Sequence, residues 1–321
     1  SMIIHIIIAR FTPLKFIFLT GHHIFYMGVM ITVILAVAGV SGIQLIILSS
    51  LINALAMSLS PILTYWAMPK VIGDSSSNVA LGHFSNVTYG ISALIGKLIG
   101  GKSSSVEDLK LPKGLSFMRD NILAIALTMS IIYIIVAIAA GSEYIEKELS
   151  NGQNFLVFSL IQGVTFAAGV SVVLQGVRMI LGEIIPAFKG ISEKLVPNAI
   201  PSLDCPIVFP YAPNAVLIGF IMSFIGGLVG LAILGITGGI LIIPGVVPHF
   251  FCGATAGVFG NATGGKRGCF IGAFVNGILL TFLPLILLPI LGDLGFQNTT
   301  FSDADFIAVG GIIGFICNLI K

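Results

Sequence analysis

The sequence predicts an all-α polytopic membrane protein with about eight transmembrane helices and some re-entrant or broken segments. Hydrophobic residues fill 56% of the 321 positions and charged residues only 9%, whereas a soluble domain needs about 25% charged residues. The mean hydropathy of +1.10 agrees with this class. The 39 glycines and 14 prolines are typical of closely packed and interrupted membrane helices, which favours a transporter over a simple anchor.

Apolar segments give the order of the predicted helices. A crossing of a hydrocarbon core about 30 Å thick takes about 20 apolar residues. Segments of this kind lie at 16–40, 43–69, 120–141, 152–182, 213–236, 239–262, 268–291 and 306–321. For the segment 239–262 two interpretations stay open, a crossing or a re-entrant stretch over residues 244–260.

Residues 80–101, ALGHFSNVTYGISALIGKLIGG, mix polar side chains into an apolar pattern. The polar positions are His83, Ser85, Asn86, Thr88 and Lys97. This composition predicts an amphipathic helix that either lies on the membrane or packs against the helix bundle. Such a helix need not cross the membrane.

An acid among five prolines marks residues 197–216, PNAIPSLDCPIVFPYAPNAV. Each proline removes a backbone donor, and unpaired backbone groups in hydrocarbon cost several kcal/mol. The segment is therefore predicted to be a re-entrant hairpin of broken backbone, buried in protein or lining a wet cavity. A carboxylate at membrane depth is costly enough to mark a functional site, so Asp204 is the first candidate for substrate binding.

Histidines supply further candidates. The stretch FLTGHHIFYMG (18–28) places His22, His23 and Tyr26 near the start of the first predicted crossing. On a helix His22 and Tyr26 share a face, whereas His23 points about 100° away, which disfavours a metal site built from the two adjacent histidines. His22 is either a ligand-binding residue or a histidine bonded to a carbonyl near a helix end. His83, judged alone, is typical of an interfacial residue.

Other functional classes find no support in the residues. The four cysteines are widely spaced and form neither a CxxC pair nor a zinc-ligand cluster, so they are interpreted as small core residues. The net charge of +2 and the lack of a basic patch with interleaved aromatic residues give no indication of nucleic-acid binding.

Several stretches together resemble one protein family. They are LTGHH (19–23), SVEDLKLP (105–112), QGVRMILGEIIPAFKGISEKLVPNAIPSLDCP (175–206), FPYAPNAVLIGF (209–220), ILIIPGVVPHFF (240–251) and GVFGNATGGKRG (257–268). Over essentially its whole length, the chain resembles the ascorbate branch of the bacterial phosphotransferase-system enzyme IIC permeases. The resemblance implies a multi-pass permease of the bacterial inner membrane, a homodimer built from inverted repeats, with a core domain beside an interface domain.

The resemblance also implies a substrate class and two partner proteins. Members bind a hydroxylated substrate, here an ascorbate-like molecule or a polyol, and move it while a separate enzyme IIB donates phosphate from its own cysteine. An enzyme IIA recharges the IIB protein. The permease itself carries no phosphoryl group, and no catalytic residue, metal or cofactor is expected.

The resemblance assigns the family's ligand-site residues to individual positions of this sequence. In the family, the histidine after Thr-Gly, the histidine of the later Gly-His pair and the acid of the Asp-Cys pair contribute to the ligand site; here they are His22, His83 and Asp204. Tyr26 and Phe84 stand where ascorbate members carry glutamines, and are predicted to line the same site. The loss of two amides removes hydrogen-bonding capacity for a hydroxyl-rich ligand, so the substrate is expected to differ from ascorbate itself.

Two further expectations concern the whole chain. Family members usually begin with about one more structural repeat, and residues 2–10 resemble the end of the helix that follows it, so this polypeptide is expected not to transport alone. A rival interpretation is an ion-coupled secondary transporter in which Asp204 takes up the coupling proton. The residues alone leave both mechanisms open.

Overall fold

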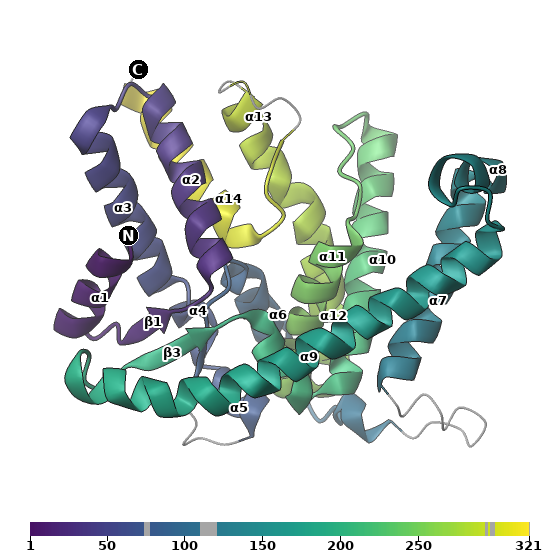
Figure 1. Cartoon of the computed structure of the whole chain (residues 1–321), viewed down its shortest axis with the longest axis horizontal. Coiled ribbons are helices and arrows are strands. Elements are labelled where there is room, and N and C mark those ends of the chain that lie inside the picture. The colour runs from purple at the N-terminus through teal and green to yellow at the C-terminus, as the bar shows by residue number, and fades with distance from the viewer. Residues whose placement is uncertain (74–77, 110–120, 293–294, 296–298, 321) are drawn as a thin grey trace. The chain divides into compact units, whose positions relative to one another are not determined.

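The computed structural model describes residues 1–73, 78–109, 121–292, 295 and 299–320. The chain forms two compact units, residues 1–107 with 184–321, and residues 108–183. Helices dominate each unit (Figure 1). The prediction of an all-α polytopic membrane protein is confirmed in this respect. The motif SVEDLKLP is described only as far as Leu109, and its last three residues lie outside the described part.

The larger unit contains most of the secondary structure. Its elements are α1 (Met2–Phe11), β1 (Phe16–Phe18), α2 (Gly21–Val37), α3 (Gly42–Leu59), α4 (Ile62–Tyr65), α5 (Met68–Ile72), β2 (Ala80–Leu81), α6 (Asn86–Ile99), β3 (Ile200–Leu203), the 3-10 helix η4 (Cys205–Tyr211), α10 (Pro213–Thr237), α11 (Val246–Pro248), the π-helix η5 (His249–Gly253), α12 (Ala254–Phe282), η6 (Leu283–Ile286), α13 (Leu287–Gly292) and α14 (Ala304–Ile320).

The smaller unit is a short run of helices. Its elements are α7 (Asn121–Ala140), α8 (Ser142–Tyr144), the π-helix η3 (Ile145–Leu149) and the first part of α9 (Phe155–Lys194); the 3-10 helix η1 (Val106–Asp108) lies at the boundary between the two units. Within this unit α7 and α9 come close together at Ser130 and Gly163, where a Cβ on the glycine would lie 2.7 Å from the Ser130 Cα atom.

Each of the eight predicted crossings overlaps a helical segment, but these segments differ in length. Among the described residues, four helices are long and apolar enough to span a membrane: 42–65, 155–173, 213–237 and 246–292. A fifth is a pair bent by 103°, 125–140 with 142–149. Helices α2 and α14 correspond to the first and last predicted crossings. Both are apolar but shorter than the four helices above.

The segment 246–292 folds back on itself. Gly265 has φ 59° and ψ −149°, which breaks the helical backbone inside α12. A Cβ on Gly260 would lie 2.7 Å from the carbonyl carbon of Gly268, although residues eight apart on a straight helix are about 12 Å apart. The two arms of α12 are therefore antiparallel, and they correspond to the predicted segments 239–262 and 268–291.

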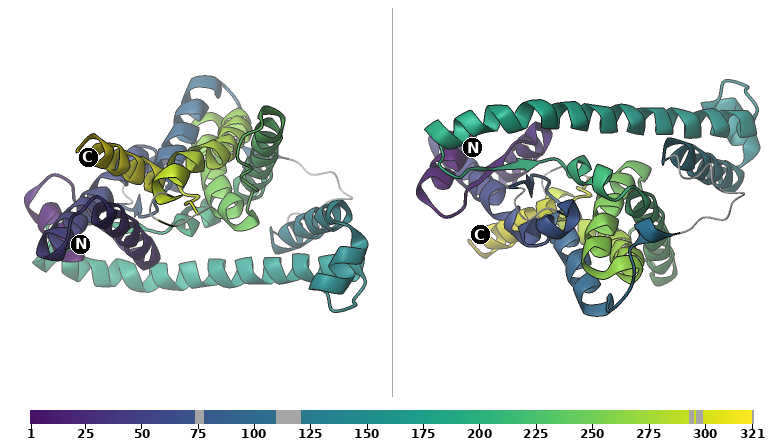
Figure 2. Two further views of the ribbon diagram at one scale, coloured as in Figure 1. Left: turned by 90° about the horizontal axis from the view of Figure 1, so that it is seen from above. Right: turned by 90° about the horizontal axis from the view of Figure 1, so that it is seen from below.

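Small residues let the helices of this hairpin approach α10 and α6. Gly219 of α10 meets the backbone of Gly257 on the first arm, and Gly226 meets the backbone of Phe274 on the second arm. Figure 2 shows α10 beside α12 in both of its views. On the other side of the hairpin, Gly96 of α6 faces Gly260. Such small-residue contacts are the usual way in which membrane helices pack.

The predicted amphipathic helix of residues 80–101 becomes β2, a short loop and α6. Helix α6 packs its polar and small residues inward, with Asn86, Thr88 and Ser92 fully buried. Its apolar residues Leu94 and Leu98 point outward, with Leu98 82% exposed. Apolar residues outside and bonded polar residues inside are the arrangement that a lipid environment favours.

A small parallel sheet lies within the larger unit. The strand order is β1-β3-β2, and both pairs are parallel; β1 and β3 lie side by side in Figure 1. The three strands come from residues near 17, 80 and 201, so the sheet joins three distant parts of the chain. The proline-rich segment 197–216 contributes β3, η4 and the start of α10, which is the broken backbone that its prolines predict.

Candidate substrate-binding site

Polar side chains follow each of the three strands. The turn after β1 enters α2, which carries His22 in its first turn; His83 stands two residues after β2; Asp204 directly follows β3. Because the strands are parallel, their carboxyl ends meet at one edge of the sheet, which is where parallel sheets commonly bind ligands. The topology therefore brings together three residues that are up to 182 positions apart in the sequence.

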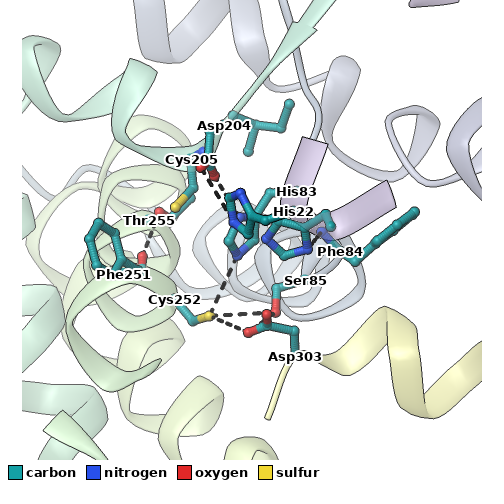
Figure 3. A network of polar contacts seen from close by, with 12 residues as sticks. His22, His83, Phe84, Ser85, Asp204, Cys205, Phe251, Cys252, Thr255 and Asp303 are labelled. Atoms are coloured by element: carbon teal, nitrogen blue, oxygen red, sulfur yellow. Dashed lines mark hydrogen bonds and ion pairs between the residues drawn. The ribbon is translucent and has the colours of Figure 1, made fainter. Parts of the chain in front are cut away.

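The Asp204 carboxylate contacts both His83 and His22. Asp204 Oδ1 lies 2.8 Å from His83 Nδ1 and accepts the backbone N–H of Cys205 at 2.7 Å. Asp204 Oδ2 lies 3.9 Å from His22 Nε2. Figure 3 shows the two imidazoles beside Asp204. Asp204 is also the N-cap of η4, so a local turn and a distant histidine fix the same oxygen.

The two oxygens of Asp204 have different surroundings. The Asp204 side chain is 39% exposed and that of His22 is 58% exposed, whereas the His83 side chain is only 7% exposed. The accessible polar pair is therefore Asp204 Oδ2 and His22 Nε2. Their separation of 3.9 Å exceeds a direct hydrogen bond and suits a bridging hydroxyl or water.

Helix ends add to the electrostatics of the site. Helices α2 and α6 both begin beside these side chains, α2 at Gly21 and α6 at Asn86. The N-terminal end of a helix carries a partial positive charge. Partial negative charge on a ligand oxygen is therefore favoured beside Asp204 and the histidines.

A buried network holds the loop that carries His83. Asn86 Nδ2 donates to the His83 carbonyl and to Ser60 Oγ, each at 2.8 Å. Ser60 Oγ in turn donates to Asp305 Oδ2 at 2.5 Å, and the Val87 N–H donates to Asp305 Oδ1 at 2.9 Å. A fully bonded polar network of this kind rigidifies its surroundings. It therefore fixes the position of the loop backbone that carries the His83 ring.

Comparison with known proteins identifies the family. The model of the family described as "PTS system sugar-specific permease component" matches residues 1–305. The chain belongs to this family. Membership and the apolar helices make it a multi-pass protein of the bacterial inner membrane.

One curated relative of this permease is an "Ascorbate-specific PTS system EIIC component" from Mycoplasma pneumoniae (strain ATCC 29342 / M129 / Subtype 1). The two are 28% identical over an alignment that covers 86% of this chain and 48% of the relative. The permease chain therefore spans about half the length of the curated relative that it matches.

The structure separates the five predicted site residues of the permease into two sets. His22, His83 and Asp204 lie together at the strand ends. Tyr26 is 52% exposed and its ring lies 5.6 Å from that of Phe25. Phe84 is fully buried, and its ring stacks on that of Phe18 at 4.6 Å. The Phe84 side chain thus faces the apolar core, whereas its backbone N–H donates to His23 Nδ1 at 3.4 Å.

Other side chains lie beside the three candidate residues and were not predicted from the sequence. The His23 ring lies 4.1 Å from that of His83 and is buried, despite its position about 100° from His22 on the helix. Ser85, Cys252 and Asp303 form a second layer on the Nε2 side of His83. The sequence signal for this layer is weak: a cysteine in an apolar run and the acidic stretch SDAD before α14.

Proposed function

We propose that this permease binds a hydroxylated substrate, ascorbate-like or a polyol, and translocates it while a separate enzyme IIB phosphorylates it. The observation that carries the proposal is the meeting of His22, His83 and Asp204 at the carboxyl ends of three parallel strands. Two imidazoles and a carboxylate can donate to and accept from several hydroxyls at once. The ascorbate-specific relative supports this class of substrate.

Asp204 has the central role in this mechanism. A substrate hydroxyl donates to Asp204 Oδ2 and accepts from His22 Nε2, which fills the 3.9 Å gap between them. During transfer, the hydroxyl oxygen attacks the phosphorus of the IIB phosphocysteine, the P–S bond breaks, and the hydroxyl proton passes to Asp204. Phosphoryl transfer depends chiefly on positioning and charge stabilisation, so the permease needs no phosphorylated residue of its own.

The assembly follows from the same proposal. The permease works as a homodimer in the lipid bilayer, with inverted repeats, a mobile core domain that carries the substrate and an interface domain that contacts the second copy. The proline-rich segment 197–216 is the re-entrant hairpin of the core. Phosphorylated IIB is the direct partner, and IIA acts upstream of it.

The coupling of transport to phosphorylation is tested with radiolabelled substrate in membrane vesicles in which this permease is co-expressed with the additional N-terminal repeat that family members usually carry. We expect uptake to require phosphoenolpyruvate and the soluble phosphotransferase proteins, and to yield phosphorylated product inside. A protonophore should leave this uptake intact. Unmodified product together with collapse of uptake by the protonophore would instead establish proton-coupled secondary transport through Asp204.

A further inference from the structure

The His83 ring has two chemically different sides. Its Nδ1 atom faces Asp204 at 2.8 Å, and its Nε2 atom lies 3.9 Å from Cys252 Sγ. An ionised carboxylate only accepts hydrogen bonds, so Nδ1 carries the proton, and in the neutral ring Nε2 then presents a lone pair. In Figure 3 Asp204 and the group of Cys252, Ser85 and Asp303 lie on opposite sides of this ring.

The groups on the Nε2 side are metal-ligand types. Cys252 Sγ lies 3.0 Å from Asp303 Oδ1, and Ser85 Oγ lies 3.3 Å from the same oxygen. Single ligand atoms of His23, His83 and Asp303 all lie within 4.8 Å of one another. Cys252 is 1% exposed and His83 is 5% exposed. These residues come from four separate parts of the chain, namely α2, the β2–α6 loop, η5 and the segment before α14, so the fold has assembled the cluster.

The negative charge of the Asp303 carboxylate has no positively charged side chain as a partner among the described residues. Within the described part of the chain, no lysine or arginine forms an ion pair with Asp303. The carboxylate instead accepts from the Cys252 thiol, a weak donor, and from the hydroxyls of Ser85 and Ser302 at 3.3 and 3.4 Å. A buried or half-buried carboxylate normally has a cation or several strong donors as partners, and a divalent ion would supply that charge.

We propose that His83 Nε2, Cys252 Sγ and Asp303 Oδ1 form a binding site for a divalent transition-metal ion of the Zn²⁺ class. Thiolate, imidazole and carboxylate are the ligand types that Zn²⁺ takes in proteins, and three protein ligands leave a fourth position for His23 or water. On binding, the Cys252 thiol gives its proton to solvent and the S–metal bond forms. Asp204 then accepts a hydrogen bond from His83 Nδ1 and orients the ligating imidazole, as carboxylates commonly do for zinc-bound histidines.

This site differs from the substrate site in both atoms and exposure. The substrate site uses Asp204 Oδ2 and His22 on the accessible side, whereas the metal site uses the opposite nitrogen of His83. The two sites share only the His83 ring. Metal binding therefore does not depend on the proposed function, and it can be measured with no sugar present.

The test uses the purified full chain in detergent, with any affinity tag removed, titrated with CoCl₂ as a spectroscopic substitute for Zn²⁺. We expect one Co²⁺ per chain, visible d–d bands and a near-ultraviolet band from a thiolate–Co²⁺ bond, all reversed by Zn²⁺. Cys252→Ser should abolish the thiolate band, and Asp303→Asn should weaken Co²⁺ binding by about tenfold or more.

Two cysteine variants serve as matched controls. Cys205 is buried, with its sulfur within 4.8 Å of ligand atoms of Asp204 and His83, and Cys269 is buried elsewhere, near the Ala215 carbonyl. Cys205→Ser and Cys269→Ser should keep the thiolate band and the Co²⁺ affinity. The proposal is overturned if the chain binds no Co²⁺, if Cys205→Ser removes the band while Cys252→Ser does not, or if His22→Gln alone abolishes binding. The last result would place the ion among His22, His23 and Asp204.

Discussion

At the scale of single residues, the two Asp204 oxygens have different tasks in the proposed substrate binding. Oδ1 is fixed by His83 and by the Cys205 N–H, while Oδ2 remains within 3.9 Å of His22 on the accessible side. A hydrogen bond to a charged group contributes about 1.5–3 kcal/mol. A ligand hydroxyl bound between Oδ2 and His22 therefore depends strongly on the negative charge.

Replacement of Asp204 by asparagine tests this division. The change keeps the size of the side chain and removes its charge, so we expect the affinity for the substrate to fall by about 10- to 100-fold. The measurement is equilibrium binding of a radiolabelled panel of ascorbate, galactitol and pentitols to membranes that contain the permease co-expressed with the additional family repeat. Asp108→Asn, at an exposed position outside the site, should bind as the unmodified chain does. Equal affinities of the two variants would remove Asp204 from the site.

The sequence was informative for these residues to different degrees. Asp204 could be predicted from its cost at membrane depth, because that argument needs only local composition. His83 was supported by the family resemblance, since by itself it is an ordinary interfacial histidine. The positions of His23, Cys252 and Asp303 could not be predicted, because their contacts with His83 join residues up to 220 positions apart and leave no local pattern.

At the scale of elements, the site is positioned by the sheet and by the α6–α12 contact. The strands have only three, two and four residues, which is too short for a recognisable alternation of polar and apolar side chains. The sequence therefore predicted the helices and the broken segment 197–216 but missed the sheet. It also predicted the two apolar segments 239–262 and 268–291 that correspond to the arms of the α12 hairpin.

The close approach of α6 to α12 gives a prediction at this scale. A Cβ on Gly96 would lie 2.7 Å from the Gly260 carbonyl oxygen and 3.2 Å from the Gly264 nitrogen, both rigid backbone atoms. Gly96→Ala should therefore destabilise the protein by about 1–3 kcal/mol through overpacking. Thermal unfolding in detergent, followed by circular dichroism, measures the loss.

Gly235 provides the matched control for this variant. It also lies within a helix, α10, but a Cβ there would meet only Leu241 Cδ2 at 3.9 Å. Because alanine is the better helix former, Gly235→Ala should leave the melting temperature unchanged or slightly raised. Equal melting temperatures for the two variants would show that α6 and α12 do not pack through Gly96.

At the scale of the whole molecule, the chain combines a membrane-protein arrangement with one polar centre. Apolar side chains such as Ile236 (87% exposed) and Leu98 cover the outside, while bonded polar groups lie within. The family match over residues 1–305 agrees with the class that composition predicted. The polar centre lies in the larger unit, where distant parts of the chain meet at the sheet.

The most direct test of the central claim is a density map of the purified permease with a bound member of the substrate panel. We predict ligand density between Asp204 Oδ2 and His22 Nε2, with the hydrogen bond between His83 and Asp204 retained. A map in which Asp204 faces an external aqueous surface far from both imidazoles, or in which the ligand touches none of the three residues, would contradict the account.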